Sequence, residues 1–373
     1  MSFYNELKAA RNKAPALLKS ADEATVLRAL GEESVSEAGF AALLSPAAVP
    51  RLEEIARRAS ALTVQHFGRT VSLYAPLYLG NYCENECLYC GFRNSSKMKR
   101  SKLSFDEAEA EGRALAASGI RHALLLTGES RVQTPVEYIS ACAGLLRKHF
   151  GSLSAEIYPL KTAEYARLAA AGADGLTLYQ ETYDEALYAR LHRAGPKRDF
   201  RYRLDAPERA CRAGMRAVGV GALLGLADFR LEVFCAGLHA AYLQHSYPGV
   251  EISVSLPRFR PQGVGYKSGG RVSDRDLVQA MTALRLFLPR AGITISTREP
   301  AELRRNLIGL GVTRMSAGSR TGVGGYAKAE KSGEQFRIAD GSGVEEVKEM
   351  IRGRGCHPVM KDWQTLQEEL CGN

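Results

Sequence analysis

The chain contains 373 residues, of which 45% are hydrophobic and 24% charged, and its 50 basic and 41 acidic residues give a formal net charge of +9. This is the composition of a soluble globular protein with enough apolar material for one large α/β barrel or two average domains. No apolar run approaches the roughly 18 residues of a membrane-spanning helix, residues 1–15 lack the apolar core of a signal peptide, and no basic block is interleaved with aromatic residues. We therefore expect a cytoplasmic protein that has neither a membrane nor a nucleic acid as partner.

Residues 1–70 have the pattern of helices. Leu52, Ile55, Ala56 and Ala59 follow the three- and four-residue spacing of one buried helical stripe. We expect residues 1–70 to form a helical N-terminal extension and not a catalytic domain.

From Val71 onward, short apolar or β-branched runs alternate with helical patterns. The clearest helix start is a capping box, Ser104-Phe-Asp-Glu107, whose two polar side chains can satisfy the first free amides. The predicted strands are Val71–Leu79, Ala123–Thr127, Ala155–Tyr158, Gly175–Tyr179, Ala217–Leu224, Glu251–Leu256, Gly292–Thr297 and Val312–Ser316. Eight strands with intervening helices favour a (β/α)8 TIM-like barrel over residues 71–320, with a doubly wound open sheet as the alternative.

Residues 321–373 would form a short C-terminal extension. It begins within a Gly-rich stretch, residues 317–326, and continues through a polar loop to one more helical pattern from Val344 to about Arg354.

Three of the eight cysteines, Cys83, Cys87 and Cys90, form a C-x3-C-x2-C motif just after the first predicted strand. Thiolates bind the irons of iron–sulfur clusters, and a cubane cluster normally has four protein ligands. Three cysteines would leave one iron open, which suits a ligand that chelates through an amine and a carboxylate. The alternative is zinc with a distant histidine, but the seven histidines are scattered, so we favour the cluster.

The other cysteines show no metal-site spacing. Cys142, Cys211 and Cys235 lie in apolar, helix-like surroundings, where a free cysteine is commonly a small buried hydrophobic residue. We expect no disulfide framework in a cytosolic chain of this size.

Polar residues follow several predicted strands at the point where each strand ends. In a barrel of parallel strands, the active site lies at this mouth. We therefore expect these residues to converge on the rim that carries the cysteines; they include Glu129, Glu181, Arg258, Arg260, Arg298, Ser316 and Ser319.

The cysteine motif, with Tyr89 before its last cysteine, resembles that of the radical S-adenosylmethionine (SAM) superfamily. Further segments resemble the 2-iminoacetate synthase family, the tyrosine lyases of thiamine biosynthesis. These segments are Pro76–Cys83, Cys87–Phe92, Leu126–Glu129, Tyr179–Tyr183, Gly221–Leu226, Ser255–Pro261, Ser296–Glu299 and Lys361–Trp363. The resemblance extends from about residue 70 to the C-terminus.

The resemblance implies a reaction with two cofactors. A reduced [4Fe–4S] cluster gives one electron to SAM, which releases methionine and a 5′-deoxyadenosyl radical. The radical abstracts a hydrogen from the amine or the phenol of L-tyrosine, and the Cα–Cβ bond breaks to give p-cresol and 2-iminoacetate (dehydroglycine). The protein would position and shield this chemistry. Thiazole synthase, which would receive the imine, and an electron donor such as flavodoxin or ferredoxin are the implied partners.

The resemblance also implies cofactor-binding residues around the cysteines, which would hold the cluster. Thr127, Gly128 and Glu129 resemble a Gly-Gly-Glu strand edge that receives the amino group of SAM, with Thr127 in place of the first glycine.

Further positions resemble SAM contacts, and each has a simpler alternative. Tyr89 would lie against the adenine or pack within its own loop, and Leu223 and Leu224 would pack against the adenine or belong to the barrel core. Arg209 would pair with the SAM carboxylate or lie on the surface. Glu181 would reach the ribose or the substrate, or act as a structural acid.

Arg298, Ser316 and Tyr78 resemble the amino-acid clamp of aromatic amino-acid lyases in this superfamily. A guanidinium can bind a carboxylate through two parallel hydrogen bonds, so Arg298 is the predicted clamp for tyrosine, with hydroxyl donors from Ser316 and Tyr78. Arg258 and Arg260 are alternative clamps or rim salt bridges. We expect the N-terminal helices and the Gly-rich stretch to close the barrel ends against water and oxygen.

Three other functions compete with this one. The tyrosine lyase of hydrogenase cofactor maturation shares the barrel and the first step but has three further cysteines for a second cluster, whereas the C-terminal part here has only Cys356 and Cys371. The tryptophan lyases of antibiotic pathways lack the Cys90-Gly-Phe92 continuation and the Lys361–Trp363 segment. From another class, the chain could be a non-enzymatic iron–sulfur or zinc-binding module.

Overall fold

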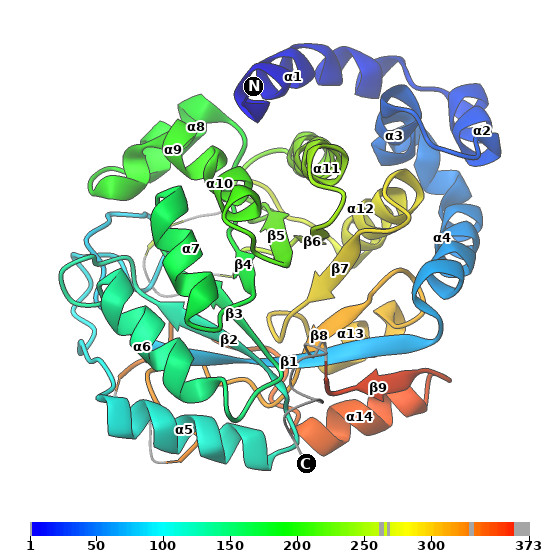
Figure 1. Ribbon diagram of the computed structural model, residues 1–373. Helices are drawn as coiled ribbons and strands as arrows, with labels where there is room; N and C mark the ends of the chain where they lie inside the picture. Colours follow the sequence, from blue (N-terminus) through cyan, green and yellow to red (C-terminus); the bar gives the residue numbers. More distant parts are fainter. Residues whose placement is uncertain (1, 261–264, 267–268, 328–331, 362–373) are drawn as a thin grey trace.

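The computed structural model describes residues 2–260, 265–266, 269–327 and 332–361. Eight parallel strands follow one another in sequence order and close into a barrel, because β1 pairs with both β2 and β8 (Figure 1). The strands are β1 (Thr70–Gly80), β2 (His122–Thr127), β3 (Ser152–Glu156), β4 (Gly175–Thr177), β5 (Ala217–Gly221), β6 (Glu251–Ser255), β7 (Gly292–Ile295) and β8 (Arg314–Ser316). The closed barrel confirms the predicted (β/α)8 class, and the open-sheet alternative is wrong.

Helices connect the strands and surround the barrel. They are α5 (Phe105–Ala117), α6 (Val136–Leu146), α7 (Thr162–Ala170), α8 (Glu185–Leu191), α9 (Phe200–Leu204), α10 (Ala206–Arg212), α11 (Phe229–Ser246), α12 (Asp274–Phe287) and α13 (Ala301–Leu307), with a 3-10 turn, η2 (Pro196–Arg198), before α9. The predicted capping box starts α5: the Ser104 hydroxyl accepts from Glu107 N–H at 3.2 Å, and the Glu107 carboxylate accepts from Ser104 N–H at 2.8 Å.

Two elements follow the barrel. They are the predicted helix, α14 (Val344–Arg352), and a short strand, β9 (His357–Val359), that the sequence did not indicate. β9 pairs in parallel with the first three residues of β1, from Thr70 to Ser72. The long β1 strand thereby connects the end of the described chain to the barrel.

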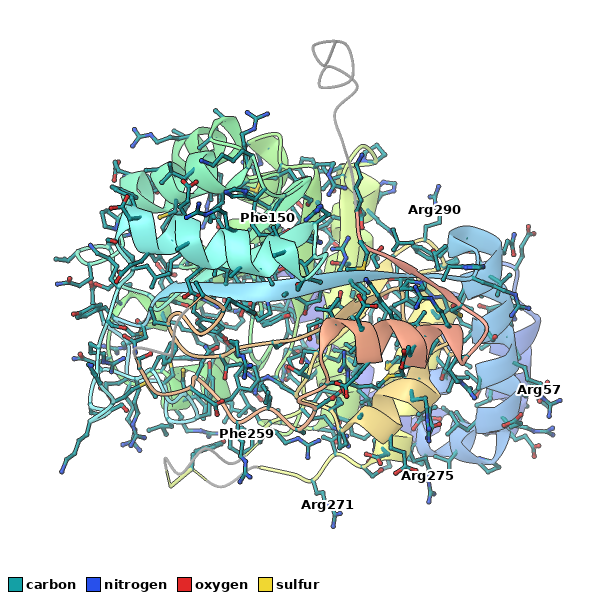
Figure 2. The ribbon with its side chains drawn as sticks, turned by 90° about the horizontal axis from the view of Figure 1, so that it is seen from below. Arg57, Phe150, Phe259, Arg271, Arg275 and Arg290 are labelled. Atoms are coloured by element: carbon teal, nitrogen blue, oxygen red, sulfur yellow. The ribbon has the colours of Figure 1, made fainter. Side chains whose placement is uncertain are left out.

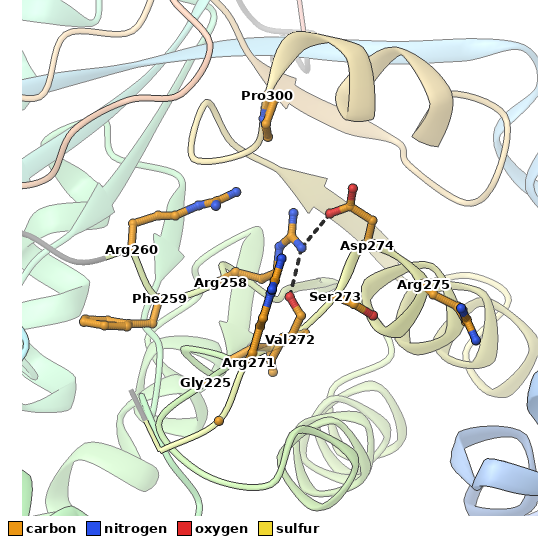
Figure 3. A pocket seen from close by; sticks show the side chains of 12 residues that line it. Gly225, Arg258, Phe259, Arg260, Arg271, Val272, Ser273, Asp274, Arg275 and Pro300 are labelled. Carbon is orange, nitrogen blue, oxygen red and sulfur yellow. Dashed lines mark hydrogen bonds and ion pairs between the residues drawn. The ribbon is translucent and has the colours of Figure 1, made fainter. Parts of the chain in front are cut away.

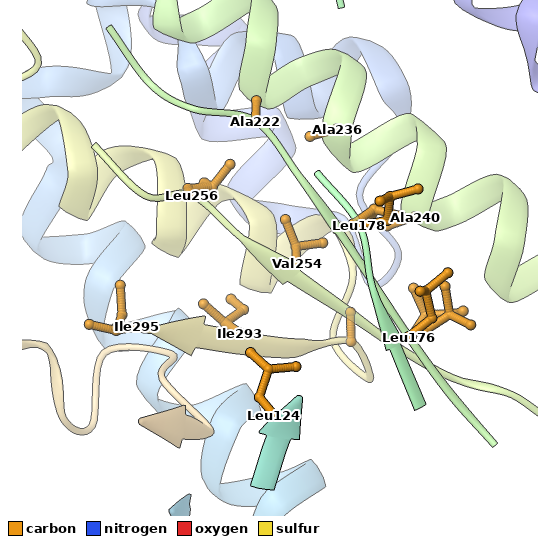
Figure 4. Packing of buried hydrophobic residues seen from close by; sticks show 14 of the residues in the cluster. Leu124, Leu176, Leu178, Ala222, Ala236, Ala240, Val254, Leu256, Ile293 and Ile295 are labelled. Atoms are coloured by element: carbon orange, nitrogen blue, oxygen red, sulfur yellow. The ribbon is translucent and has the colours of Figure 1, made fainter. Parts of the chain in front are cut away.

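Side chains alternate between the two faces of the barrel strands. Outward-facing residues of β4, β6 and β7, such as Leu176, Val254 and Ile293, are buried in the main hydrophobic core with Ala236 and Ala240 of α11 (Figure 4). Several inward-facing residues are small or polar and line a narrow cavity inside the barrel; they include Ser154, Thr177, Gly219, Ser253 and Thr294.

This polar interior explains one strand boundary that differs from its prediction. β3 covers Ser152–Glu156, whereas the apolar run predicted a strand over Ala155–Tyr158. Ser152 and Ser154 belong to the strand because a barrel interior accepts small polar side chains, which an apolar pattern does not detect.

The N-terminal helices form an outer layer beside α11 and α12 (Figure 1). They are α1 (Phe3–Ser20), α2 (Glu23–Gly31), α3 (Glu37–Leu44), η1 (Pro46–Arg51) and α4 (Leu52–Phe67). α1 packs on α11, and α3 and α4 pack on α12. Ile55, Ala56 and Ala59 of α4 are buried as predicted. The layer therefore packs on two of the helices that surround the barrel, and its expected role in closing a barrel end stays a prediction.

Several basic side chains lie on the outside of the protein. Arg57, Arg271, Arg275 and Arg290 are exposed and point away from the protein body (Figure 2).

In the part of the chain that the structure describes, none of the helices has the length and apolar character needed to cross a bilayer. Some sequence predictions fell on Pro261, Asp362, Trp363 and Cys371, and these residues lie outside the described ranges.

Candidate active site

The cysteine motif lies in the loop that follows β1 at the mouth of the barrel. Cys83, Cys87 and Cys90 are free thiols, and all three line one cavity, which we call the cysteine cavity. The side chain of Asn81 orders this loop, because its oxygen accepts from Ser101 N–H at 2.8 Å. The loop therefore arranges three thiols around a common space. Cys142, Cys211 and Cys235 are buried free thiols, as predicted.

Cys83, Cys87 and Cys90 fit the ligand set of a cubane cluster, in which each thiolate binds a different iron. Within the described residues, no three His, Cys, Asp or Glu side chains are grouped as the ligands of a metal ion. Burial, and next the charge of Glu129, raises the pKa of the Cys83 thiol to about 11. Metal binding must therefore displace the thiol protons.

The edge of β2 packs directly against the cysteine loop. A Cβ at Gly128 would lie 2.2 Å from the carbonyl oxygen of Tyr82, so only glycine fits this contact. Thr127 and Glu129 on either side line the cysteine cavity. The Thr127 hydroxyl is buried and has no hydrogen-bond partner among the described residues, which leaves it available to a ligand.

Four buried charges face the cysteines. Glu129 accepts from Arg203 Nη1 at 2.9 Å, and Glu181 accepts from Lys197 Nζ at 2.7 Å. Lys197 Nζ also lies 3.6 Å from Glu129, which joins the two pairs into one network. Burial on its own would raise the pKa of Glu129, but the charges of Arg203 and Lys197 outweigh burial and lower this pKa to about 2. The same two cations lower the pKa of Glu181 against the effect of burial, so both acids are ionised at neutral pH.

Glu181 also has an unusual backbone conformation. Its φ of 72° makes it the one non-glycine residue with positive φ in the described part of the chain. Such a conformation costs of order 1–3 kcal/mol and persists when its surroundings enforce it. Here the Glu181 carbonyl accepts from Leu223 N–H at 2.8 Å, which holds the carboxylate toward Lys197.

Lys197 and Arg203 were not among the residues predicted from the sequence. A search for polar residues at strand ends does not reach them, because they lie in η2 and α9, well beyond the end of β4. Arg209, which the resemblance suggested, lies elsewhere. Its Nε donates to Leu160 O at 2.8 Å and its Nη2 to Tyr202 O at 2.6 Å, and it does not line the cysteine cavity. The position of Arg209 therefore gives no support to a contact with SAM.

Tyr89 and Leu223 pack in a small apolar cluster with Cys87. The Tyr89 hydroxyl lies 2.8 Å from His192 Nε2, and the two rings meet edge to face. Leu224 belongs to the main core. Neither Tyr89 nor Leu224 lines the cysteine cavity, and this arrangement matches the packing alternatives for both residues.

A second cavity contains the predicted amino-acid clamp, and we call it the clamp cavity. Tyr78, Arg298 and Ser316 all line it. The Arg298 guanidinium stacks on the Phe336 ring at 3.5 Å, and no described carboxylate forms a salt bridge with it. Ser316 Oγ accepts from Thr297 N–H at 3.1 Å, and the Ser316 side chain also hydrogen-bonds to the Tyr74 hydroxyl. The structure thus brings together three residues that are distant in sequence.

The segment after β8 adds further lining residues. Tyr78 O–H donates to Gln335 Oε1 at 2.6 Å, which engages the proton that the predicted clamp would donate. The Ser319 hydroxyl is buried in the clamp cavity without a hydrogen-bond partner among the described residues. Tyr326 anchors the Gly-rich stretch to the barrel, because its hydroxyl donates to Pro76 O at 2.8 Å.

The cysteine cavity and the clamp cavity adjoin each other. Leu126, Glu156, Tyr179 and Gln335 line both. Glu156 was not predicted from the sequence, although the alternation from Ser152 through Ser154 to Glu156 places it on the inner face of β3. The shifted prediction of β3 hid that pattern.

Arg258 and Arg260 lie at a third cavity, on the rim near the start of α12 (Figure 3). Arg258 Nε donates to Glu299 at 3.0 Å, and its Nη1 donates to Asp274 at 2.7 Å. Arg260 Nη2 donates to Glu299 at 3.0 Å. Both residues therefore form rim salt bridges, and Arg298 is the arginine that faces the clamp cavity.

Known protein families and proteins of similar sequence match most of this chain. Residues 77–230 match the Radical SAM superfamily, and residues 255–357 match the Biotin and Thiamin Synthesis associated domain. The chain is 42% identical over 343 residues to a curated 2-iminoacetate synthase from Escherichia coli (strain K12), which covers 92% of this chain and 91% of that protein. The chain belongs to the 2-iminoacetate synthase family. A family member from Salmonella typhimurium is 41% identical over the same shares of the two chains.

A solved structure supports the fold of this family member. The X-ray structure of the FeFe-hydrogenase maturase HydG from Carboxydothermus hydrogenoformans superimposes with a TM-score of 0.88 and 30% identity, covering 95% of this chain and 84% of that one. The family assignment makes the protein a radical SAM enzyme, and the superfamily implies a [4Fe–4S] cluster and SAM as cofactors.

Proposed function

We propose that the protein is a tyrosine lyase that cleaves the Cα–Cβ bond of L-tyrosine to 2-iminoacetate and p-cresol, with 5′-deoxyadenosine and methionine as co-products. The main support is that Arg298, Ser316 and Tyr78 line a cavity that adjoins the three cysteines, in a chain 42% identical to a curated 2-iminoacetate synthase. The imine would be used for thiazole formation in thiamine biosynthesis.

The clamp residues bind the amino-acid end of tyrosine. Arg298 has a guanidinium without a described salt-bridge partner, and its stacking on Phe336 fixes the plane in which it can meet a carboxylate. Ser316 donates its hydroxyl proton to the same carboxylate when it exchanges its hydrogen bond with Tyr74 for one with the substrate. Tyr78 either breaks its hydrogen bond to Gln335 and donates to the substrate, or keeps that bond and accepts a hydrogen bond through its oxygen.

The residues near the cysteines bind the cofactors. Cys83, Cys87 and Cys90 would hold the cluster, and Glu129, Thr127 and the backbone at Gly128 would receive the amino group of SAM. When bound, the reduced cluster supplies the electron that cleaves SAM and starts hydrogen abstraction.

Glu181 is the candidate contact for the ribose. Its negative charge is balanced by Lys197 on one side, so it can accept a hydrogen bond from a neutral hydroxyl without a new cation.

The Gly-rich stretch and the following segment exclude water from this chemistry. Gln335 and Phe336 line the clamp cavity, and Thr321 O accepts from Gln335 N–H at 2.9 Å, which connects the two parts of the cover. We propose thiazole synthase as the partner that receives the imine, and flavodoxin or ferredoxin as the electron donor.

An anaerobic assay tests the proposed function. The reconstituted protein should bind about four irons per chain, as a cubane requires, and should release p-cresol from L-tyrosine with SAM and dithionite. The variant Cys87→Ala should lose cluster-dependent cleavage of SAM and release no p-cresol.

Other products would point to other functions. Zinc without iron–sulfur absorbance would overturn the enzyme assignment. Cyanide and carbon monoxide together with p-cresol would favour the hydrogenase-type activity, and cleavage of tryptophan in place of tyrosine would favour the tryptophan lyases.

A further inference from the structure

Glu156 lies where the cysteine cavity and the clamp cavity meet. It is the last residue of β3 and follows Ser152 and Ser154 on the inner face of that strand. Four residues line both cavities, and Glu156 is the acidic one among them. A molecule that occupies both cavities therefore has Glu156 among the residues that line its path.

The carboxylate of Glu156 has no partner inside the protein. None of the described residues forms a hydrogen bond or a salt bridge with it. The two other acids of these cavities differ in this respect, because Glu129 is paired with Arg203 and Glu181 with Lys197. Burying an ionised carboxylate in such a site costs folding free energy unless a cation or a hydrogen-bond donor contacts it.

Burial and the neighbouring charges determine the pKa of Glu156. Burial, and next the negative charge of Glu181, raises the pKa of Glu156 to about 7. The cations Arg298, Arg203 and Lys197 act in the opposite direction but do not restore an ordinary value. An additional positive charge next to this carboxylate would lower its pKa and stabilise it.

The proposed substrate supplies such a charge. An amino acid whose carboxylate meets Arg298 has its ammonium group one carbon away, and Arg298 and Glu156 line the same cavity. We propose that Glu156 binds the α-ammonium group of the substrate and so fixes the amino-acid end between an acid on β3 and the arginine after β7. This inference rests on the proposed function, and it assigns the ammonium contact to a residue of this chain.

The opposite charges of Arg298 and Glu156 also explain how the protein would select its substrate. A ligand with only a carboxylate satisfies Arg298 but leaves Glu156 buried and unpaired, and a ligand with only an amine does the reverse. Leaving a buried charged group unsatisfied costs more than the missing hydrogen bond itself. The clamp would therefore favour amino acids over both the corresponding acids and amines.

Equilibrium binding with three ligands tests this assignment. The reconstituted holoenzyme is mixed with SAM but without reductant, so that no turnover occurs, and is titrated with L-tyrosine, with 3-(4-hydroxyphenyl)propionate, which lacks the ammonium, and with tyramine, which lacks the carboxylate. Glu156→Gln should weaken binding of L-tyrosine and tyramine about 10- to 100-fold and leave binding of the propionate unchanged. Arg298→Lys should give the complementary pattern, with weaker L-tyrosine and propionate binding and unchanged tyramine binding.

Two controls separate a local effect from a loss of structure. The exposed Glu302 on α13 provides a matched variant, Glu302→Gln, that should bind all three ligands as the unchanged protein does. Glu156→Asp keeps the charge and should bind L-tyrosine more tightly than Glu156→Gln.

The outcomes distinguish this inference from the proposed function. If the unchanged protein binds and cleaves L-tyrosine while Glu156→Gln binds L-tyrosine equally well, Glu156 does not hold the ammonium and the inference is overturned. An equal loss of affinity for all three ligands in Glu156→Gln also overturns it. If the unchanged protein neither binds nor cleaves L-tyrosine, the proposed function itself fails.

Discussion

At the scale of single residues, Gly128 illustrates how the absence of a side chain positions a reactive loop. Its N–H donates to Gly80 O at 2.8 Å, and the Tyr82 backbone lies where a Cβ would stand. The obstacle is backbone and not the end of a flexible side chain, so it cannot move aside without moving the chain that leads into Cys83. The contact therefore couples the edge of β2 to the cysteine loop.

We expect Gly128→Ala to displace the cysteine loop. The new methyl group would lie 2.2 Å from Tyr82 O, and overpacking of this kind typically costs about 1–3 kcal/mol. Urea unfolding should show this loss, and iron content after reconstitution should fall. The same substitution at the exposed Gly144 in α6 is the control, because its Cβ would meet only Ala171 O at 3.8 Å and alanine favours a helix. Equal iron content in the two variants would show that the close contact does not position the loop.

At the scale of secondary-structure elements, α11 is connected to its neighbours through one buried acid. Glu232 is fully buried and accepts from Tyr183 N–H at 2.7 Å and from the Thr182 hydroxyl at 3.0 Å, both in the loop after β4. Arg11 of α1 lies 3.6 Å away from the same carboxylate. One side chain therefore joins a barrel helix, an active-site loop and the N-terminal layer.

The titration of Glu232 should make stability depend on pH. Burial raises the pKa of Glu232 to about 7 in the folded protein, against the hydrogen bond from Tyr183 and the charge of Arg11, whereas an unfolded glutamate titrates near 4.3. The folded state therefore binds the extra proton between about pH 4.3 and pH 7, and stability from this group falls as pH rises through that window, by at most about 1.4 kcal/mol per pH unit.

Glu232→Gln removes this titration. The stability of the variant relative to the unchanged protein should rise between about pH 5 and pH 7 in anaerobic urea unfolding. Glu302→Gln at the protein surface serves as the control and should keep a constant difference over the same range. A constant difference for Glu232→Gln as well would mean that the folded protein does not raise the pKa of Glu232 into this pH range.

The element that carries each site residue explains whether that residue could be predicted from the sequence. Periodicity and strand ends predicted the barrel, the cysteine loop and the positions of Arg298 and Ser316, because parallel strands deliver their ends to one rim. Lys197 and Gln335 reach the cavities from connecting segments, whose path no periodicity encodes. Likewise, Arg203 and Arg209 lie in the neighbouring short helices α9 and α10, and only the packing determines which one faces the cysteines.

At the scale of the whole molecule, the N-terminal layer shares its core with the barrel helices. Phe40 of α3 is fully buried, and its ring stacks on Phe287 at a centroid distance of 4.3 Å and on Phe234 of α11 at 5.7 Å. A Cβ at Gly237 of α11 would meet the Phe40 ring at 2.5 Å, so the two helices are in close contact there. This aromatic stack joins α3 of the layer to α11 and α12 of the barrel in one hydrophobic core.

We therefore expect residues 1–70 and the barrel to unfold together. Phe40→Ala should lower the stability of the whole molecule by about 3–5 kcal/mol, because the cavity lies between α3, α11 and α12, and the urea transition should remain single. Phe105→Ala is the matched control, since Phe105 is 47% exposed, and it should cost less than about 1 kcal/mol. A separate early transition in Phe40→Ala, with the barrel transition unchanged, would instead show that the N-terminal helices fold as an independent unit, in which case the contact with α11 and α12 would be an interface between domains and not part of one core.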